Sequence, residues 1–270
     1  MPSARTADLL TSLLTGHSRR VSAELAGSPH TEVHFGSQGP LAGSTCPWAR
    51  LLHSLTNILY IRATDLSIWS TRSIKGDVIT SVSDFTTFWK RLAEQFKSNS
   101  LVVFDLQNEP HDMDNTVLFN LLQGAIKGIR SVGATSQYIF VEGNAWTAAG
   151  SWVSSGNGAN LVNLEDPNDK LVYEVHSYLD GDASGTSETC ASPSIGQERV
   201  EVFTAWLKEN GKKGFLGEFA GGANSVCKEA IDGMLTYLEE NKSVWMGWCW
   251  WAAGARWASS LLRDPPTAIT

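Results

Sequence analysis

The sequence has no run of about 18 apolar residues, the minimum that a membrane-spanning helix requires. Its first 20 residues, MPSARTADLLTSLLTGHSRR, are short of the apolar core that a secretion signal carries. No glycine-rich phosphate loop follows an expected strand, and H-E-x-x-H and G-x-S-x-G patterns do not occur. The sequence therefore predicts no membrane segment, no dinucleotide site, no zinc-protease helix and no serine nucleophile elbow.

Basic residues are the minority among the charged ones. The 21 Lys and Arg residues are outnumbered by 28 Asp and Glu, which gives a net charge of −7 and a pI near 5.4. Phosphates would be repelled by such a surface, so we expect no nucleic-acid partner. A neutral polymer such as a polysaccharide is compatible with this charge.

Cysteine is also scarce, whereas tryptophan is plentiful. None of the four Cys residues forms a C-x-x-C pair, so we expect no structural zinc site, and the six scattered His residues suggest no other metal site. The 11 Trp residues offer flat apolar faces that suit stacking on sugar rings. Ordinary core packing is the competing explanation for about half of them.

The chain divides into three parts of unequal regularity. Residues 1–77 are rich in Ser, Thr, Arg and Ala with weak periodicity, and only 55–66 has the character of a strand. We expect this segment to be atypical and poorly ordered. Residues 78–254 form the regular core, and 255–270 form an atypical tail.

In the regular core, helical and strand patterns alternate. A capping box at 81–84 begins a helix, and further helices are expected at 115–131, from a cap formed by Ser194 and Gln197 to Gly211, and around 231–238. Short apolar runs predict buried strands at 101–107, 137–143, 170–178, 214–220 and 244–251. Strands that alternate with helices pair in parallel. The fold class is therefore α/β, either an open doubly wound sheet or a (β/α)8 barrel.

Polar residues at the carboxyl ends of several strands favour the barrel, because barrel enzymes build their sites there. Glu109 and Glu218 are the two candidates for a catalytic carboxylate pair, which glycoside cleavage requires. Asn108, beside the first of them, is placed to bind a sugar 2-hydroxyl. Each short motif alone is weak, since a strand-end Glu is more often a solvated loop residue.

The remaining candidates lie on later strands. His176 and Tyr178 share strand parity and point the same way, so Tyr178 is placed to hold Glu218 and His176 to contact the substrate or the acid. A satisfied structural hydrogen bond is an equally good explanation for the histidine. Trp251 is placed to form the floor of a sugar subsite, with barrel packing as its alternative.

Two other carboxylates compete with the predicted pair. Glu142 ends a strand before Gly143, and Glu174 lies within the next strand. Glu142 lacks a neighbouring Asn, so we expect it to support the site or the fold rather than to catalyse.

The segments LQNEP (106–110), VEGNAW (141–146), HSYLD (176–180), GEFAGG (217–222) and WWAAG (250–254) occur in the order and spacing of a known family. The sequence resembles glycoside hydrolase family 5, particularly the fungal endo-β-1,4-glucanases, over about 78–254. The resemblance implies a (β/α)8 TIM-type barrel, a retaining mechanism with Glu109 as acid/base and Glu218 as nucleophile, a β-glucan substrate, no cofactor, a monomer and an extracellular location. It also implies a disulfide between Cys190 and Cys227.

The two ends of the chain depart from the family pattern. An Arg and a His-Asn pair are expected on the first three strands, but the chain reads DLSIWSTRSIKG (65–76) where the pair belongs. The tail ARWASSLLRDPPTAIT (255–270) also differs, so the barrel is expected to be incomplete or irregular in its N-terminal part. Two alternatives therefore stay open: a β-mannanase or β-1,3-glucanase on the same scaffold, and a non-catalytic carbohydrate-binding remnant.

Overall fold

A computed structural model of the chain describes residues 32–35, 59–62 and 81–251. Seven strands form one sheet, and their order across the sheet follows their order in the chain. The strands are β1 (Glu32–Phe35), β2 (Leu59–Arg62), β3 (Val102–Asp105), β4 (Tyr138–Glu142), β5 (Leu171–His176), β6 (Gly214–Glu218) and β7 (Trp245–Trp248). β1 pairs antiparallel with β2, whereas every later pair is parallel.

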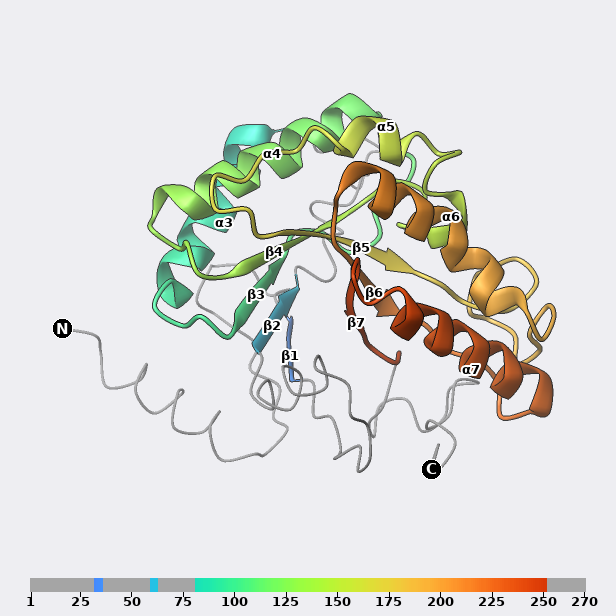
Figure 1. Cartoon of the computed structure of the whole chain (residues 1–270). Helices are drawn as coiled ribbons and strands as arrows, with labels where there is room; N and C mark the ends of the chain where they lie inside the picture. The colour runs from blue at the N-terminus through green and yellow to red at the C-terminus, as the bar shows by residue number, and fades with distance from the viewer. Residues whose placement is uncertain (1–31, 36–58, 63–80, 252–270) are drawn as a thin grey trace.

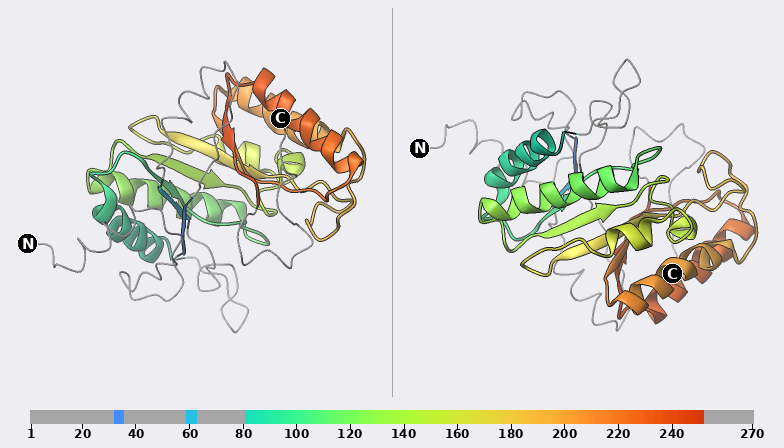
Figure 2. Two further views of the ribbon diagram at one scale, coloured as in Figure 1. Left: turned by 90° about the horizontal axis from the view of Figure 1, so that it is seen from below. Right: turned by 90° about the horizontal axis from the view of Figure 1, so that it is seen from above.

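Helices connect the parallel strands and lie along the outer side of the curved sheet (Figures 1 and 2). They are α3 (Val82–Phe96), α4 (Asn115–Ser131), α5 (Asn157–Leu161), α6 (Ile195–Asn210) and α7 (Ser225–Glu240), with the short 3-10 helix η2 (Ala149–Ser151). This arrangement confirms the predicted α/β class with a parallel sheet. The antiparallel β1 is the irregularity in the N-terminal part.

The periodicity of apolar residues in the sequence predicted most of the helices and strands. All five strands and all four helices that were expected after residue 80 are present, and β2 lies within the strand segment expected at 55–66. β1, η2 and α5 were not predicted, because each is too short to show a clear period. Most of the segment 1–77 and the tail 255–270 lie outside the described residues.

Helix capping explains where several of these elements begin and end. Ser81 accepts a hydrogen bond from the Asp84 N–H, as the capping box predicted, and Gly211 ends α6 with a left-handed φ of 61°. Ser194 occupies the N-cap position of α6, as predicted, but the expected capping bonds of Ser194 and Gln197 do not form. The Ser194 side chain donates to Glu198 and makes no capping bond, and Gln197 donates to Glu201.

The core lies between the sheet and the helices. An aromatic cluster fills it where α6 packs on β5, with T-shaped contacts of Trp152 to Tyr173 and to Phe203. Core packing therefore accounts for several of the tryptophans, namely Trp89, Trp152, Trp206 and Trp245. Among the described residues, none of the helices combines the length and the apolar character that crossing a membrane requires.

The parallel register sets the positions of the polar strand ends. Glu142 at the end of β4 pairs with Glu174 in β5, and His176 at the end of β5 pairs with Glu218 at the end of β6. The carboxyl ends of these strands therefore bring residues that are far apart in the sequence to one edge of the sheet.

Candidate active site

Glu109 follows β3 on a backbone that few residues other than glycine adopt. Its φ is +48°, and its N–H donates a hydrogen bond of 2.6 Å to Oε2 of Glu142. Pro110 comes next and restricts the chain further. The side chain of Glu109 is 27% exposed, so its carboxylate is open to a ligand.

Glu218 ends β6 and is much less accessible, with a side chain 5% exposed. The Tyr178 hydroxyl donates a hydrogen bond of 2.7 Å to Glu218 Oε2. A carboxylate that accepts a short hydrogen bond is held in one orientation.

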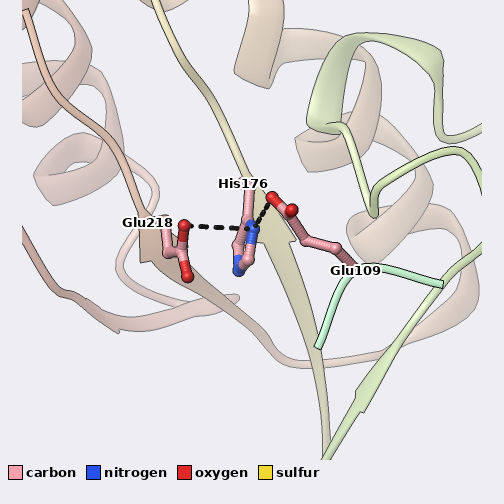
Figure 3. Close-up of side chains that lie close together, drawn as sticks. All are labelled: Glu109, His176 and Glu218. Atoms are coloured by element: carbon pink, nitrogen blue, oxygen red, sulfur yellow. Dashed lines mark hydrogen bonds and ion pairs between the residues drawn. The ribbon is translucent and has the colours of Figure 1, made fainter. Parts of the chain in front are cut away.

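His176 lies between the two carboxylates and contacts both (Figure 3). Its Nδ1 is 2.7 Å from Glu109 Oε1 and 3.6 Å from Glu218 Oε2. One oxygen of each carboxylate and a nitrogen of His176 all lie within 4.8 Å of one another. The fold therefore brings together the two candidate carboxylates and the histidine that the sequence singled out.

The electrostatics of the cluster centre on His176. Burial alone would lower the pKa of its imidazole, but Glu218, Glu142, Glu109 and Glu174 surround it and together raise the pKa well above 6.5. These four carboxylates therefore favour the protonated form of the ring, whose Nδ1 lies beside Oε1 of Glu109.

The same groups come close enough to hold a cation. They form two triplets that share His176, one with Glu109 and Glu218 and the other with Glu142 and Glu174. A metal-bound histidine must be neutral, because the coordinating nitrogen donates its lone pair to the metal. Binding of a metal ion here would therefore require His176 to give up a proton that the surrounding carboxylates favour.

Asn108 and Trp251 lie at the same edge of the sheet. Asn108 is half-buried directly before Glu109. The Trp251 N–H donates a hydrogen bond of 3.0 Å to the carbonyl of Phe219, so the residue lies beside the strand end that carries Glu218. All six predicted site residues thus lie at the carboxyl ends of β3, β5, β6 and β7.

Two aromatic rings near Glu109 were not selected from the sequence. Trp146 is 50% exposed and stacks on His111, with ring centroids 4.6 Å apart and planes 9° apart. The Trp146 N–H donates to the carbonyl of Pro110, which fixes the pair next to Glu109. The motif VEGNAW contains Trp146, but only the fold shows that its ring faces solvent beside the site.

The loop after β5 is held in place by covalent and polar contacts. Cys190 and Cys227 form a disulfide, the pair that the family resemblance implies. The Asp180 carboxylate accepts hydrogen bonds from the N–H groups of Gly185, Thr186 and Ser187. Gly185 packs on the ring of Tyr178, so this loop supports the residue that orients Glu218.

Comparison with known proteins gives the same family. A model described as cellulase (glycosyl hydrolase family 5) matches residues 58–254. A probable endo-beta-1,4-glucanase B from Aspergillus kawachii is 57% identical over 198 residues, which are 72% of this chain and 59% of that protein. The chain thus spans less than two thirds of the length of this relative.

Solved structures agree with the sequence match. An endo-beta-1,4-glucanase from Xanthomonas axonopodis pv. citri is 37% identical with a TM-score of 0.71, over 85% of this chain and 79% of that one. XacCel5A in complex with cellopentaose is 40% identical with a TM-score of 0.69, over 81% of this chain and 72% of that one. Because the family model covers most of the chain, the chain belongs to glycosyl hydrolase family 5, the cellulase family.

Proposed function

We propose that the protein is a retaining endo-β-1,4-glucanase that hydrolyses internal bonds of cellulose and related β-glucans. The observation that carries this proposal is the closeness of Glu109 and Glu218, which offer carboxylate oxygens within 4.8 Å of each other. Retaining glycosidases place their carboxyl groups about 5–5.5 Å apart, whereas inverting enzymes separate them by about 6.5–9.5 Å to admit a water.

In the first step, Glu218 attacks the anomeric carbon and forms a covalent glycosyl-enzyme. Protonated Glu109 gives its proton to the departing glycosidic oxygen. The hydrogen bond from Tyr178 holds Glu218 in position for this attack. The Nδ1–H of His176 orients Glu109 through its 2.7 Å contact with Oε1.

In the second step, Glu109 is a carboxylate and acts as the base. It removes a proton from water, which attacks the anomeric carbon and releases Glu218. Two inversions at the same carbon give net retention. Both steps use only the two carboxylates and water, so the proposed mechanism requires no cofactor.

The proposed substrate is a β-1,4-linked glucan. The exposed face of Trp146 beside Glu109 supports sugar stacking, and Trp251 and Asn108 lie at the same edge. A relative was solved with cellopentaose, and the curated relatives carry endo-β-1,4-glucanase names. We infer an extracellular location, because the disulfide between Cys190 and Cys227 persists in an oxidising compartment.

The first test is hydrolysis of carboxymethyl cellulose, mannan and laminarin by the wild type, Glu109→Gln and Glu218→Gln. We expect release of reducing ends from carboxymethyl cellulose and its loss in Glu218→Gln by a factor of at least about 1,000. Proton NMR of the nascent product would give the β-anomer first.

The other possible outcomes would each change one part of the proposal. Preference for mannan or laminarin would replace the proposed substrate with that glycan, and an α-anomer would refute retention. Binding of cellulose without turnover would identify a carbohydrate-binding remnant. Equal activity in Glu218→Gln would remove that residue from the role of nucleophile.

A further inference from the structure

A second pair of carboxylates, Glu142 and Glu174, lies beneath the catalytic pair. Both side chains are fully buried, and they are register partners on the neighbouring strands β4 and β5. The proposed mechanism assigns no step to either residue. Burial of two ionisable groups side by side is costly unless they serve a positive charge or a hydrogen-bond donor.

His176 is the group beside this pair that can carry a positive charge. Nε2 of its ring lies 3.8 Å from Glu142 Oε1 and 3.8 Å from Glu174 Oε1. Nδ1, on the opposite edge of the ring, faces Glu109 and Glu218. The imidazole thus separates a buried carboxylate pair from the catalytic pair, and each nitrogen faces one of them.

The hydrogen-bond donor that faces Glu142 is the backbone N–H of Glu109. Its N–H gives Glu142 Oε2 a hydrogen bond of 2.6 Å, while its φ is +48°. A left-handed conformation at a residue other than glycine persists only where surrounding contacts impose it. Glu142 supplies such a contact and thereby fixes the point from which the acid/base side chain departs.

Glu174 lies against the backbone that carries the nucleophile. A Cβ atom added to Gly217 would collide with the Glu174 carboxylate. Gly217 immediately precedes Glu218, so the glycine of the GEFAGG segment makes room for the buried acid. Through this contact Glu174 touches the backbone that carries Glu218. In the same way, Glu142 is bonded to the backbone that carries Glu109.

We propose that Glu142 and Glu174 are positioning residues that hold the His176 ring between the two carboxylate pairs and, through Glu142, hold the backbone of Glu109. The proposal rests on the proposed function for its effect on catalysis, but the charge of His176 is a property of the folded protein alone. The pKa of His176 is raised by Glu218, Glu142, Glu109 and Glu174, which face it from the ends of β3 and β4, from β5 and from β6. Removing one buried charge therefore lowers the pH at which the ring loses its proton.

The first experiment follows the ring nitrogens of His176 by NMR against pH, with His176→Gln to assign the signals. We expect the midpoint of the wild-type ring to lie above the ordinary pKa of histidine, and to fall by about 1–2 pH units in Glu142→Gln and in Glu174→Gln. A neutral wild-type ring at pH about 7 would overturn the proposal without any variant. Unchanged midpoints in both variants would also overturn it.

The second experiment compares kcat/KM for two substrates in Glu142→Gln. Cellotetraose has a poor leaving group that needs the proton of Glu109, whereas 2,4-dinitrophenyl β-cellobioside does not. We expect a loss of at least about 10-fold on cellotetraose and of less than about threefold on the aryl substrate. Equal losses on both substrates would show a general structural defect and would contradict the positioning role.

Asp166→Asn is the matched control, because Asp166 is also a buried carboxylate but lies near the amino end of β5, away from the site. It should leave both the His176 midpoint and the ratio of the two substrates unchanged. If the wild type hydrolyses neither substrate, the proposed function fails while the NMR experiment still tests the buried pair. If Glu142→Gln does not fold, Glu174→Gln and the wild-type titration decide the question.

Discussion

The side chain of Trp146 is half exposed, and its backbone has a conformation that bulky residues seldom adopt. Ala145, Trp146 and Thr147 have φ values of 57°, 55° and 48°. Hydrogen bonds from Trp146 N–H to Pro110 and from Thr147 N–H to Gly143 impose this turn. Each residue in such a conformation costs about 1–3 kcal/mol, and strained residues of this kind cluster at functional sites. The turn presents an indole face to solvent next to Glu109.

Replacing Trp146 with Ala should raise KM for cello-oligosaccharides about three- to tenfold, because the stacking contact with a sugar ring is lost. kcat should change less, since the carboxylates and His176 are untouched. Steady-state kinetics on cellotetraose would measure both. Val153→Ala removes another exposed apolar side chain, 52% exposed, and should leave KM unchanged. An unaltered KM in the Trp146 variant would exclude this platform from substrate binding.

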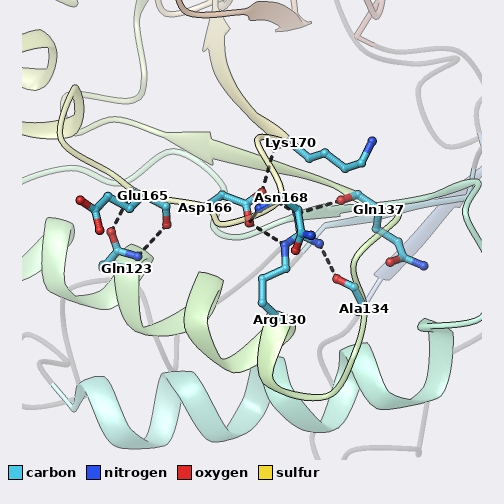
Figure 4. Close-up of polar contacts among 8 residues, drawn as sticks. All are labelled: Gln123, Arg130, Ala134, Gln137, Glu165, Asp166, Asn168 and Lys170. Atoms are coloured by element: carbon cyan, nitrogen blue, oxygen red, sulfur yellow. Dashed lines mark hydrogen bonds and ion pairs between the residues drawn. The ribbon is translucent and has the colours of Figure 1, made fainter.

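At the scale of elements, a polar brace ties the end of α4 to the connection that enters β5 (Figure 4). Arg130 donates to both carboxylate oxygens of Asp166 at 2.8 Å and to the carbonyls of Ala134 and Gln137. Burial would raise the pKa of Asp166, but the bonds from Arg130 and from the N–H groups of Asn168 and Lys170 together lower it. The brace lies at the amino ends of β4 and β5, opposite the active site.

Arg130→Met should lower the free energy of unfolding by about 3–5 kcal/mol, because it leaves the buried Asp166 without its counter-charge. Urea denaturation of the variant and the wild type would give the difference. Arg91→Met, at an exposed position of α3, should change stability by less than about 0.5 kcal/mol. At a temperature where the variant is folded, kcat should match that of the wild type. A loss of kcat there would contradict a purely stabilising role.

The loop between β5 and α6 is the second element with a defined energetic role. Its disulfide joins residues separated by 37 positions, and Arg199 donates to the carbonyls of Tyr178 and Asp180. Reduction of the disulfide should lower the free energy of unfolding by about 4 kcal/mol in the chain-entropy model. Denaturation with and without dithiothreitol would measure this effect.

Cys249→Ser serves as the control for that experiment, because Cys249 is outside the disulfide and half-buried. The variant should respond to dithiothreitol as the wild type does. The double variant Cys190→Ala/Cys227→Ala should have reduced stability and no response to the reductant. A persisting response would place the sensitive thiol elsewhere.

For the whole molecule, the buried charge of His176 couples stability to pH. Its pKa is raised well above 6.5 in the folded state, so folded protein binds a proton that unfolded protein releases above that pH. The stability that this histidine contributes is complete below pH about 6.5 and is lost as the pH rises through the folded pKa. Alkaline conditions should therefore weaken the fold.

The comparison that isolates this effect is wild type against His176→Gln, by chemical denaturation at several pH values between about 6 and 9. The stability of the wild type relative to the variant should decrease above pH about 6.5, by up to about 1.4 kcal/mol per pH unit. A relative stability that stays constant or increases with pH would show that the ring is neutral in the folded protein.

The sequence predicted the long elements well and singled out candidate site residues that the fold brings together, for identifiable reasons. Helices such as α4, at 115–131, carry a full apolar stripe, and strands such as β5 are unbroken apolar runs. Glu109 and Glu218 stood out because each follows or ends such a run. The short α5, the antiparallel β1 and the side-chain bond of Ser194 depend on contacts that no local pattern records.

By itself the sequence determined the α/β class, the family and the six residues at the strand ends, because apolar periodicity and short motifs are local properties of the chain. Only the tertiary structure decided which carboxylates meet. Strand register places the His176 ring between two carboxylate pairs. Its Nδ1 faces Glu109 and Glu218, and its Nε2 faces Glu142 and Glu174. Distances between residues more than 30 positions apart follow from how the strands pair, and no single segment of the sequence determines that pairing.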